Sequence, residues 1–147
     1  DKLHSIISSV KNIVVSMRRT YHIHSERIYL AGFGAGADVA VDVMMQRPEW
    51  FGGVLSLNGT LSNFDKPVNA SSDLVDKRLL IATSVSSVNR HLGQAIATSR
   101  LFYAAGMKVG TRIYKGSPSS PSRKMLRDID AWLMDEICTA NAAGHSA

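Results

Sequence analysis

Apolar side chains recur at helical spacing in four segments of the chain. Between Leu3 and Met17 they stand at positions 3, 6, 7, 10, 13, 14 and 17, which predicts a helix with one buried face. A second helix is expected to follow Gly36 and to end near Arg47, because Pro48 disfavours helical backbone in the residue before it. The third and fourth helices are expected over 91–105 and from about residue 123 to Ile137. Their predicted buried positions are Leu92, Ile96, Leu101 and Ala104 in the third, and Leu126, Ile129, Leu133 and Ile137 in the fourth.

Short apolar runs alternate with these helices. The runs at 27–31, 53–57 and 79–82 lack polar alternation, which indicates strands buried on both faces, and residues 109, 111 and 113 alternate as a fourth strand. Residues 60–76 are polar and predict a long loop. This order is typical of an α/β fold with a parallel sheet covered by helices on both faces. We expect one domain over 1–138 and a flexible tail over 139–147.

Composition narrows the class of protein without assigning an activity. The chain has 147 residues, 45% hydrophobic and 20% charged, which fits one globular domain. No apolar run reaches the roughly 20 residues that a membrane helix needs. The single Cys138 excludes an internal disulfide. The net charge of +5 is spread in pairs of basic residues at most, so we expect a solvated surface and no nucleic-acid partner.

The run from Gly32 to Ala37, Gly-Phe-Gly-Ala-Gly-Ala, stands between a predicted strand and a predicted helix. Two motifs occupy such a turn: the nucleophile elbow G-x-S-x-G, which presents a catalytic serine, and the dinucleotide fingerprint G-x-G-x-x-G/A. The run fits both spacings, apart from the missing serine. A dinucleotide site also needs a carboxylate at the end of the next strand, and that strand ends in Leu57-Asn58-Gly59. Nucleotide binding is therefore the weaker alternative.

The flanking sequence resembles a known family. Residues 21–33 and 47–54 resemble the segments before and after the elbow in α/β-hydrolase esterases of the carboxylesterase, phospholipase and dienelactone-hydrolase type. Residues 79–82, 104–114 and 128–133 resemble the strand before the acid loop, the approach to the histidine loop and the final helix. The resemblance covers nearly all of 3–137. It implies the C-terminal part of that fold, without the N-terminal strands and the loop that supplies one oxyanion amide, so that at most the Ala35 amide remains of that hole.

The same resemblance places the catalytic triad on three residues that lack its chemistry. The nucleophile position falls on Gly34, the acid position on Ser87, give or take one residue, and the base position on Pro118. Acyl transfer needs a nucleophile, a base that takes its proton and an acid that orients the base. We therefore expect a pseudoenzyme, with no catalytic residue and an elbow turn formed by Gly32, Gly34, Ala35 and Gly36.

Other candidate chemistry has an ordinary explanation. His22 and His24 lie in a polar connection without a neighbouring Cys or carboxylate, so we expect no metal. Asp38 and Asp42, one helical turn apart, are expected on an exposed face with mild repulsion rather than as a catalytic pair. No cofactor is expected.

These observations lead to one preferred function and one structural expectation. The preferred function is an inactive structural or protein-interaction module. The alternative is a part of a larger active carboxylic-ester hydrolase whose catalytic residues lie elsewhere. The chain opens with Asp1 and shows no signal-peptide pattern, so we expect a cut piece, of unknown compartment. The strand at 28–32 has no earlier strand to pair with. We expect its free edge to be covered by the missing N-terminal half, a partner subunit or a second copy.

Overall fold

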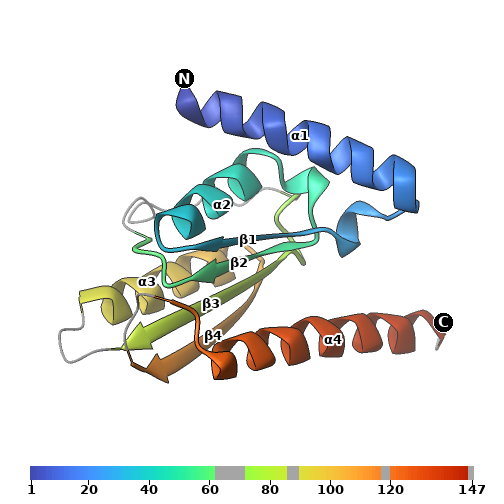
Figure 1. The fold of residues 1–147 in the computed structure, drawn as a ribbon. Helices are drawn as coiled ribbons and strands as arrows, with labels where there is room; N and C mark the ends of the chain where they lie inside the picture. Colours follow the sequence, from blue (N-terminus) through green and yellow to red (C-terminus); the bar gives the residue numbers. More distant parts are fainter. Residues whose placement is uncertain (62–71, 86–89, 117–119, 146–147) are drawn as a thin grey trace.

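Helices and strands alternate along the described chain. The computed structural model describes residues 1–61, 72–85, 90–116 and 120–145, and only the backbone of 90, 91 and 136–145. The elements within these residues are α1 (Lys2–Tyr21), β1 (Tyr29–Phe33), α2 (Ala35–Gln46), β2 (Gly53–Leu57), β3 (Arg78–Val85), α3 (Arg90–Ala104), β4 (Lys108–Lys115) and α4 (Arg123–His145) (Figure 1). Single turns of 3-10 helix, η1 (Ser25–Arg27) and η2 (Pro48–Trp50), precede β1 and β2.

The strands form a parallel sheet in the order β1-β2-β3-β4. Tyr29 pairs with Gly53, Gly53 with Arg78, and Arg78 with Lys108, so the strands start nearly level with one another. The strand order equals the chain order, since α2 carries the chain from β1 to the neighbouring β2 and α3 carries it from β3 to the neighbouring β4. This confirms the predicted parallel α/β sheet.

Helices cover both faces of this sheet and enclose two apolar cores. Val54, Leu79 and Ile81 point to the face packed against α2 and α3, and α1 adds Ile7 and Val14 from outside α2. The opposite face packs against α4. Its core consists of Leu55, Leu57, Leu80, Ala82, Tyr114 and Met125. The alternation of inward positions along β2 and β3 follows from the two-residue period of a strand.

A hydrogen bond and an aromatic contact fasten α4 across the sheet. The Tyr114 hydroxyl of β4 donates a hydrogen bond of 2.8 Å to Asp128 of α4. Burial, then the bond to this carboxylate, raises the pKa of Tyr114 to about 12, so the phenol stays a donor at neutral pH. At the opposite edge of the sheet, on the same face, the Trp132 ring of α4 contacts the Tyr29 ring of β1 edge to face, with ring centroids 6.1 Å apart. α4 therefore contacts both outer strands.

The predicted buried face of α3 is wrong. Of the four predicted positions, Ile96 is 39% exposed, Ala104 is exposed, and Leu92 and Leu101 are half-buried. The buried residues are Ala95, Thr98, Phe102 and Ala105. This face places small side chains against the sheet, so the helix lies close to it, and Phe102 supplies the bulk of the contact. The prediction failed because it preferred the larger Ile and Leu side chains as buried positions.

The last helix is longer than the apolar spacing indicated, and its first turn buries a different residue from the predicted one. α4 continues to His145, beyond the residue 139 at which the tail was expected to begin. Its first turn buries Met125 completely, whereas Leu126, which was predicted to be buried, is 51% exposed. The apolar spacing that defined the predicted helix ends at Ile137, but helical backbone needs no apolar stripe to continue.

The shortest connection in the fold joins β1 to α2 through the single residue Gly34. A Cβ on Gly32, in β1, would overlap the carbonyl oxygen of Gly36 and lie 2.6 Å from the Cα of Ala37. The first turn of α2 therefore rests directly on the backbone of β1. A Cβ on Gly36 would meet no atom within 4 Å. Two glycines of one motif thus have opposite steric requirements.

We expect Gly32→Ala to destabilise the protein and Gly36→Ala to leave it equally or more stable. The first change forces a methyl group into backbone, at a cost of about 2 kcal/mol or more. The second replaces the poorer helix former, with a gain of up to about 0.5 kcal/mol. Urea denaturation of both variants measures the difference. Equal stability of the two variants would show that α2 does not rest on Gly32.

Candidate functional site

The turn between β1 and α2 has an unusual backbone at one residue. Gly34 adopts φ 58 and ψ −126, a left-handed conformation that residues with a Cβ rarely occupy. Its N–H donates to the Leu57 carbonyl at 2.8 Å, and its carbonyl accepts from the Ala37 N–H at 3.0 Å. A strand, one residue with positive φ and a helix follow one another, which is the arrangement of a nucleophile elbow.

Gly34 has room for a side chain and lacks one. A Cβ built on it would meet nothing within 4 Å. The other residues predicted for the turn lie beside it. Gly32 makes the close backbone contact with α2, and Ala35 and Gly36 are the first two residues of that helix. Ser87 and Pro118 lie outside the described residues. The turn thus presents backbone N–H groups at a helix N-terminus but no nucleophile at Gly34.

The histidines whose side chains are described lie away from this turn. His4 is in α1, and His22 and His24 lie between α1 and η1, before the amino end of β1. Gly34 follows the carboxyl end of β1, a five-residue strand about 16 Å long. None of these three imidazoles is placed to act as a base for a group at Gly34. Among the described residues, no three His, Cys, Asp or Glu side chains cluster in a way that could hold a metal ion.

Asp38 fastens the chain that leaves β2. One of its carboxylate oxygens accepts from the Thr60 hydroxyl at 2.6 Å and the other from the Leu61 N–H at 2.9 Å. Asn58 makes a similar link to β3, since its side-chain oxygen accepts from the Ser84 N–H at 2.6 Å. Both oxygens of Asp38 are therefore engaged in holding backbone and side chain beside the elbow. The residue serves as a clamp, a role that the sequence did not indicate because Thr60 lies 22 positions away.

Asp42 is also closer to the core than predicted. Asp38 and Asp42 are both half-buried, so the expected exposed face is wrong. Burial, and secondly the charge of Asp38, raises the pKa of Asp42 above its ordinary value of 3.8. The raised pKa means that the ionised form is disfavoured in the folded state. The expected mutual repulsion of the two carboxylates is present, and burial adds the larger effect.

We expect Asp42→Asn to be more stable than the parent protein at pH 7. Because the pKa of Asp42 is higher in the folded protein, protonation of Asp42 increases the free energy of unfolding. This stabilisation is fully present below pH 3.8 and is lost as the pH rises through the folded-state pKa. The gain at pH 7 should reach about 0.2–0.5 kcal/mol, the size of an i,i+4 like-charge repulsion, and disappear near pH 3.5. Thermal denaturation at both pH values tests this, with Asp130→Asn on the exposed side of α4 as the control. A gain that is the same at both pH values would contradict it.

None of the helices in the described part of the chain combines the length and the apolarity needed to cross a membrane.

Solved structures share this arrangement, and some of them are named as carboxylesterases. SOBER1 from Arabidopsis thaliana superposes with a TM-score of 0.71 at 17% identity, over 92% of this chain and 64% of its own. The carboxylesterase of Bacillus cereus gives 0.72 at 12% identity, over 90% and 61%. A phospholipase/carboxylesterase from Dyadobacter fermentans gives 0.65 at 18% identity, over 90% and 63%. At these identities the likeness shows the fold, and this chain spans less than two thirds of each of these structures.

The sequence gives an independent assignment. No curated protein sequence matches the chain significantly. The model of the Phospholipase/Carboxylesterase family, however, matches residues 1–136. This match covers nearly the whole chain and agrees with the resemblance found around the glycine turn. The chain therefore belongs to the phospholipase/carboxylesterase family of α/β-hydrolases.

Proposed function

We propose that this chain is an esterase-like domain without catalytic activity of its own, serving as a structural or protein-interaction module. The observation that carries the proposal is Gly34. It stands at the residue of the elbow from which a nucleophile projects, with an open space around it and no side chain to fill that space. Gly34 thus has the backbone conformation of an elbow residue and no side chain that could act as a nucleophile.

The family positions of the other two triad members support the same conclusion. They fall on Ser87 and Pro118, and neither a neutral hydroxyl nor a proline ring can orient or replace a base. Asp38, the nearest described carboxylate along the chain, has both oxygens engaged by Thr60 and Leu61. A water or hydroxyl near the elbow would therefore find no described base to accept its proton.

The alternative is that the chain belongs to a larger carboxylic-ester hydrolase with working residues elsewhere. It rests on the share of the related structures that the chain spans, 61% to 64% in the three named above. A protein of that size would hold further residues beside the elbow. Under this alternative, the turn at Gly34 contributes backbone N–H groups to the active site, and another residue provides the nucleophile.

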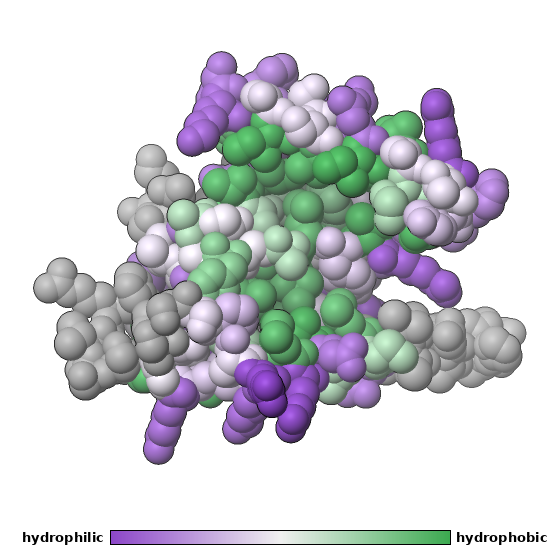
Figure 2. Space-filling view, in the orientation of Figure 1, coloured by the Kyte–Doolittle hydropathy of each residue, from purple (hydrophilic) through white to green (hydrophobic). Residues whose placement is uncertain are grey.

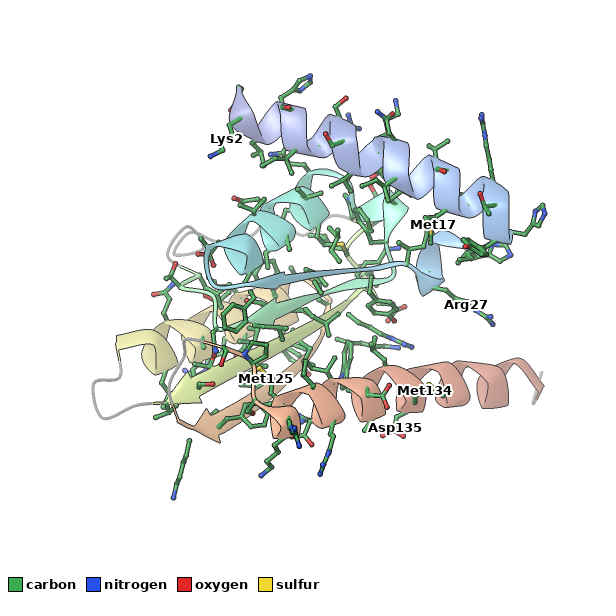
Figure 3. All side chains as sticks on the ribbon, in the orientation of Figure 1. Lys2, Met17, Arg27, Met125, Met134 and Asp135 are labelled. Atoms are coloured by element: carbon green, nitrogen blue, oxygen red, sulfur yellow. The ribbon has the colours of Figure 1, made fainter. Side chains whose placement is uncertain are left out.

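The edge of the sheet at β1 provides the interaction surface of the proposed module. Within the described residues β1 pairs with β2 alone, and in a parallel strand alternate residues direct their N–H and C=O groups away from that partner. Figure 2 shows apolar residues gathered beside this edge, between α1 and α4. Met17 of α1 and Met134 of α4, which are 42% and 52% exposed, flank it (Figure 3). We propose that the missing N-terminal half, a partner subunit or a second copy covers this edge.

The catalytic proposal predicts no turnover of short activated acyl esters above the blank. It also predicts no labelling of the chain by a serine-directed fluorophosphonate, since no described serine has a base positioned beside it. Gly34→Ser is the matched variant: it restores the hydroxyl without a base and should remain at the blank. Turnover by Gly34→Ser, or stoichiometric labelling of any serine in the parent chain, would contradict the proposal.

The interaction proposal predicts that the isolated chain is not a well-behaved monomer. An apolar strand edge with unpaired backbone groups favours association at micromolar concentration. Sedimentation should show species heavier than 16.0 kDa. Hydrogen exchange should be much faster at β1 than at β3, which is paired on both sides. A monomer with β1 protected as strongly as β3 would show that the edge is covered within the chain.

A further inference from the structure

One exposed flank of α1, beside its buried face, carries a line of basic residues. His4, Lys11 and Arg18 are separated by seven positions each, a spacing that brings them to one side of the helix, and His22 follows as the cap residue after its end. Arg19 widens this line at its carboxyl end. Positions 2–21 contain no Asp or Glu. We call the line formed by His4, Lys11, Arg18, Arg19 and His22 the basic stripe of α1.

The members of the basic stripe are exposed and have no ionic partner among the described residues. The carboxylates that follow α1 in the chain pair elsewhere: Glu26 lies 2.7 Å from Lys77, and Glu49 lies 3.7 Å from Arg47. Arg18 and Arg19 complement the negative end of the helix dipole, which stabilises α1. Lys11 lies nearly three turns before that end, where the dipole no longer explains a cation.

Two shallow hollows follow the basic stripe. One, of about 600 Å³, is lined by Val15, Arg18, Arg19, His22, Ile23 and His24. The other, of about 480 Å³, is lined by Lys11, Asn12, Val15, Ser16, Arg19 and Thr20. They share Val15 and Arg19, so they form one continuous depression with cations along it and two aliphatic side chains in its floor. No carboxylate lines either hollow.

The dimensions and chemistry of this depression select among anionic partners. The stripe runs for about 27 Å, the rise of 18 helical residues, which an extended segment of about eight residues spans. A lipid surface is disfavoured because the lining offers only Val15 and Ile23 for insertion, without Trp, Phe or Leu. Nucleic acid is disfavoured because the lining holds no Phe, Tyr or Trp for base stacking, and its aromatic rings are the two imidazoles of His22 and His24. An acidic polypeptide needs only charge and shallow apolar contact.

We propose that the basic stripe of α1 is a docking surface for an acidic segment of another protein. Carboxylates of the segment pair with Lys11, Arg18 and Arg19, and small aliphatic side chains between them rest on Val15. The surface does not involve Gly34 or the edge of β1. It therefore holds whether or not the domain catalyses a reaction, and it is tested separately from those proposals.

The test measures binding of a fluorescein-labelled decaglutamate peptide to the full chain by anisotropy. The variant Lys11→Gln/Arg18→Gln/Arg19→Gln removes three charges from the stripe. The matched control Arg123→Gln/Lys124→Gln/Arg127→Gln removes three exposed charges from α4. We expect the stripe variant to bind at least about tenfold more weakly than the parent chain and the control to bind within about twofold of it. Binding of the parent chain should fall as salt rises.

Lys11→Glu alone serves as a second variant, because it leaves the end of α1 intact and should also weaken binding. Equal losses in the stripe variant and in the α4 control would show attraction by net charge alone and overturn the proposal. So would tighter binding, dependent on the stripe, of phosphatidylserine vesicles or of a duplex oligonucleotide than of decaglutamate. These results would assign the stripe to a lipid surface or to nucleic acid.

Discussion

The contact between β1 and the first turn of α2 governs the arrangement of the rest of the fold. Gly32 brings strand and helix backbone together, and Gly34 reverses the chain within a single residue of positive φ. The direction of α2 then sets where η2 and β2 begin, and β2 in turn receives β3. A side chain at Gly32 would separate the two layers at the point where they are closest. The same geometry leaves the carboxyl end of β1 open above the turn.

Polar groups near this turn are used for structure. Asp38 holds Thr60 and Leu61, and Asn58 holds Ser84, so the ends of β2 and β3 are fixed relative to α2. Asn58 and Leu61 both adopt φ 52, a conformation that such hydrogen bonds help to maintain. The described residues at the carboxyl ends of β2 and β3 are thus held in place by side-chain hydrogen bonds. Rigidity of this kind suits a catalytic site, and it suits equally a domain that only presents surfaces to other proteins.

Periodicity predicted the elements well and their faces less well. The strand at 53–57 has the predicted bounds because glycine and asparagine end the apolar run. α3 shows the limit of this reasoning, since Ala95 and Thr98 are buried while Ile96 is exposed. Helical spacing defines several possible faces, and the close approach of helix and sheet selects the small residues. The Asp38 clamp was beyond local reasoning for a related reason, because its partners lie more than 20 positions along the chain. The glycine turn was predictable, since strand, turn and helix are consecutive in sequence.

The sequential order of the strands has a consequence for how the domain forms. Each strand pairs with the next one along the chain, so no pairing in the described sheet waits for a distant segment. During synthesis, α1, β1, α2 and β2 emerge as a unit that already contains the Gly32 contact, and each later crossover adds one strand to an existing edge. Each described strand made after β2 is added on the side away from β1, so none of them pairs with the opposite side of β1.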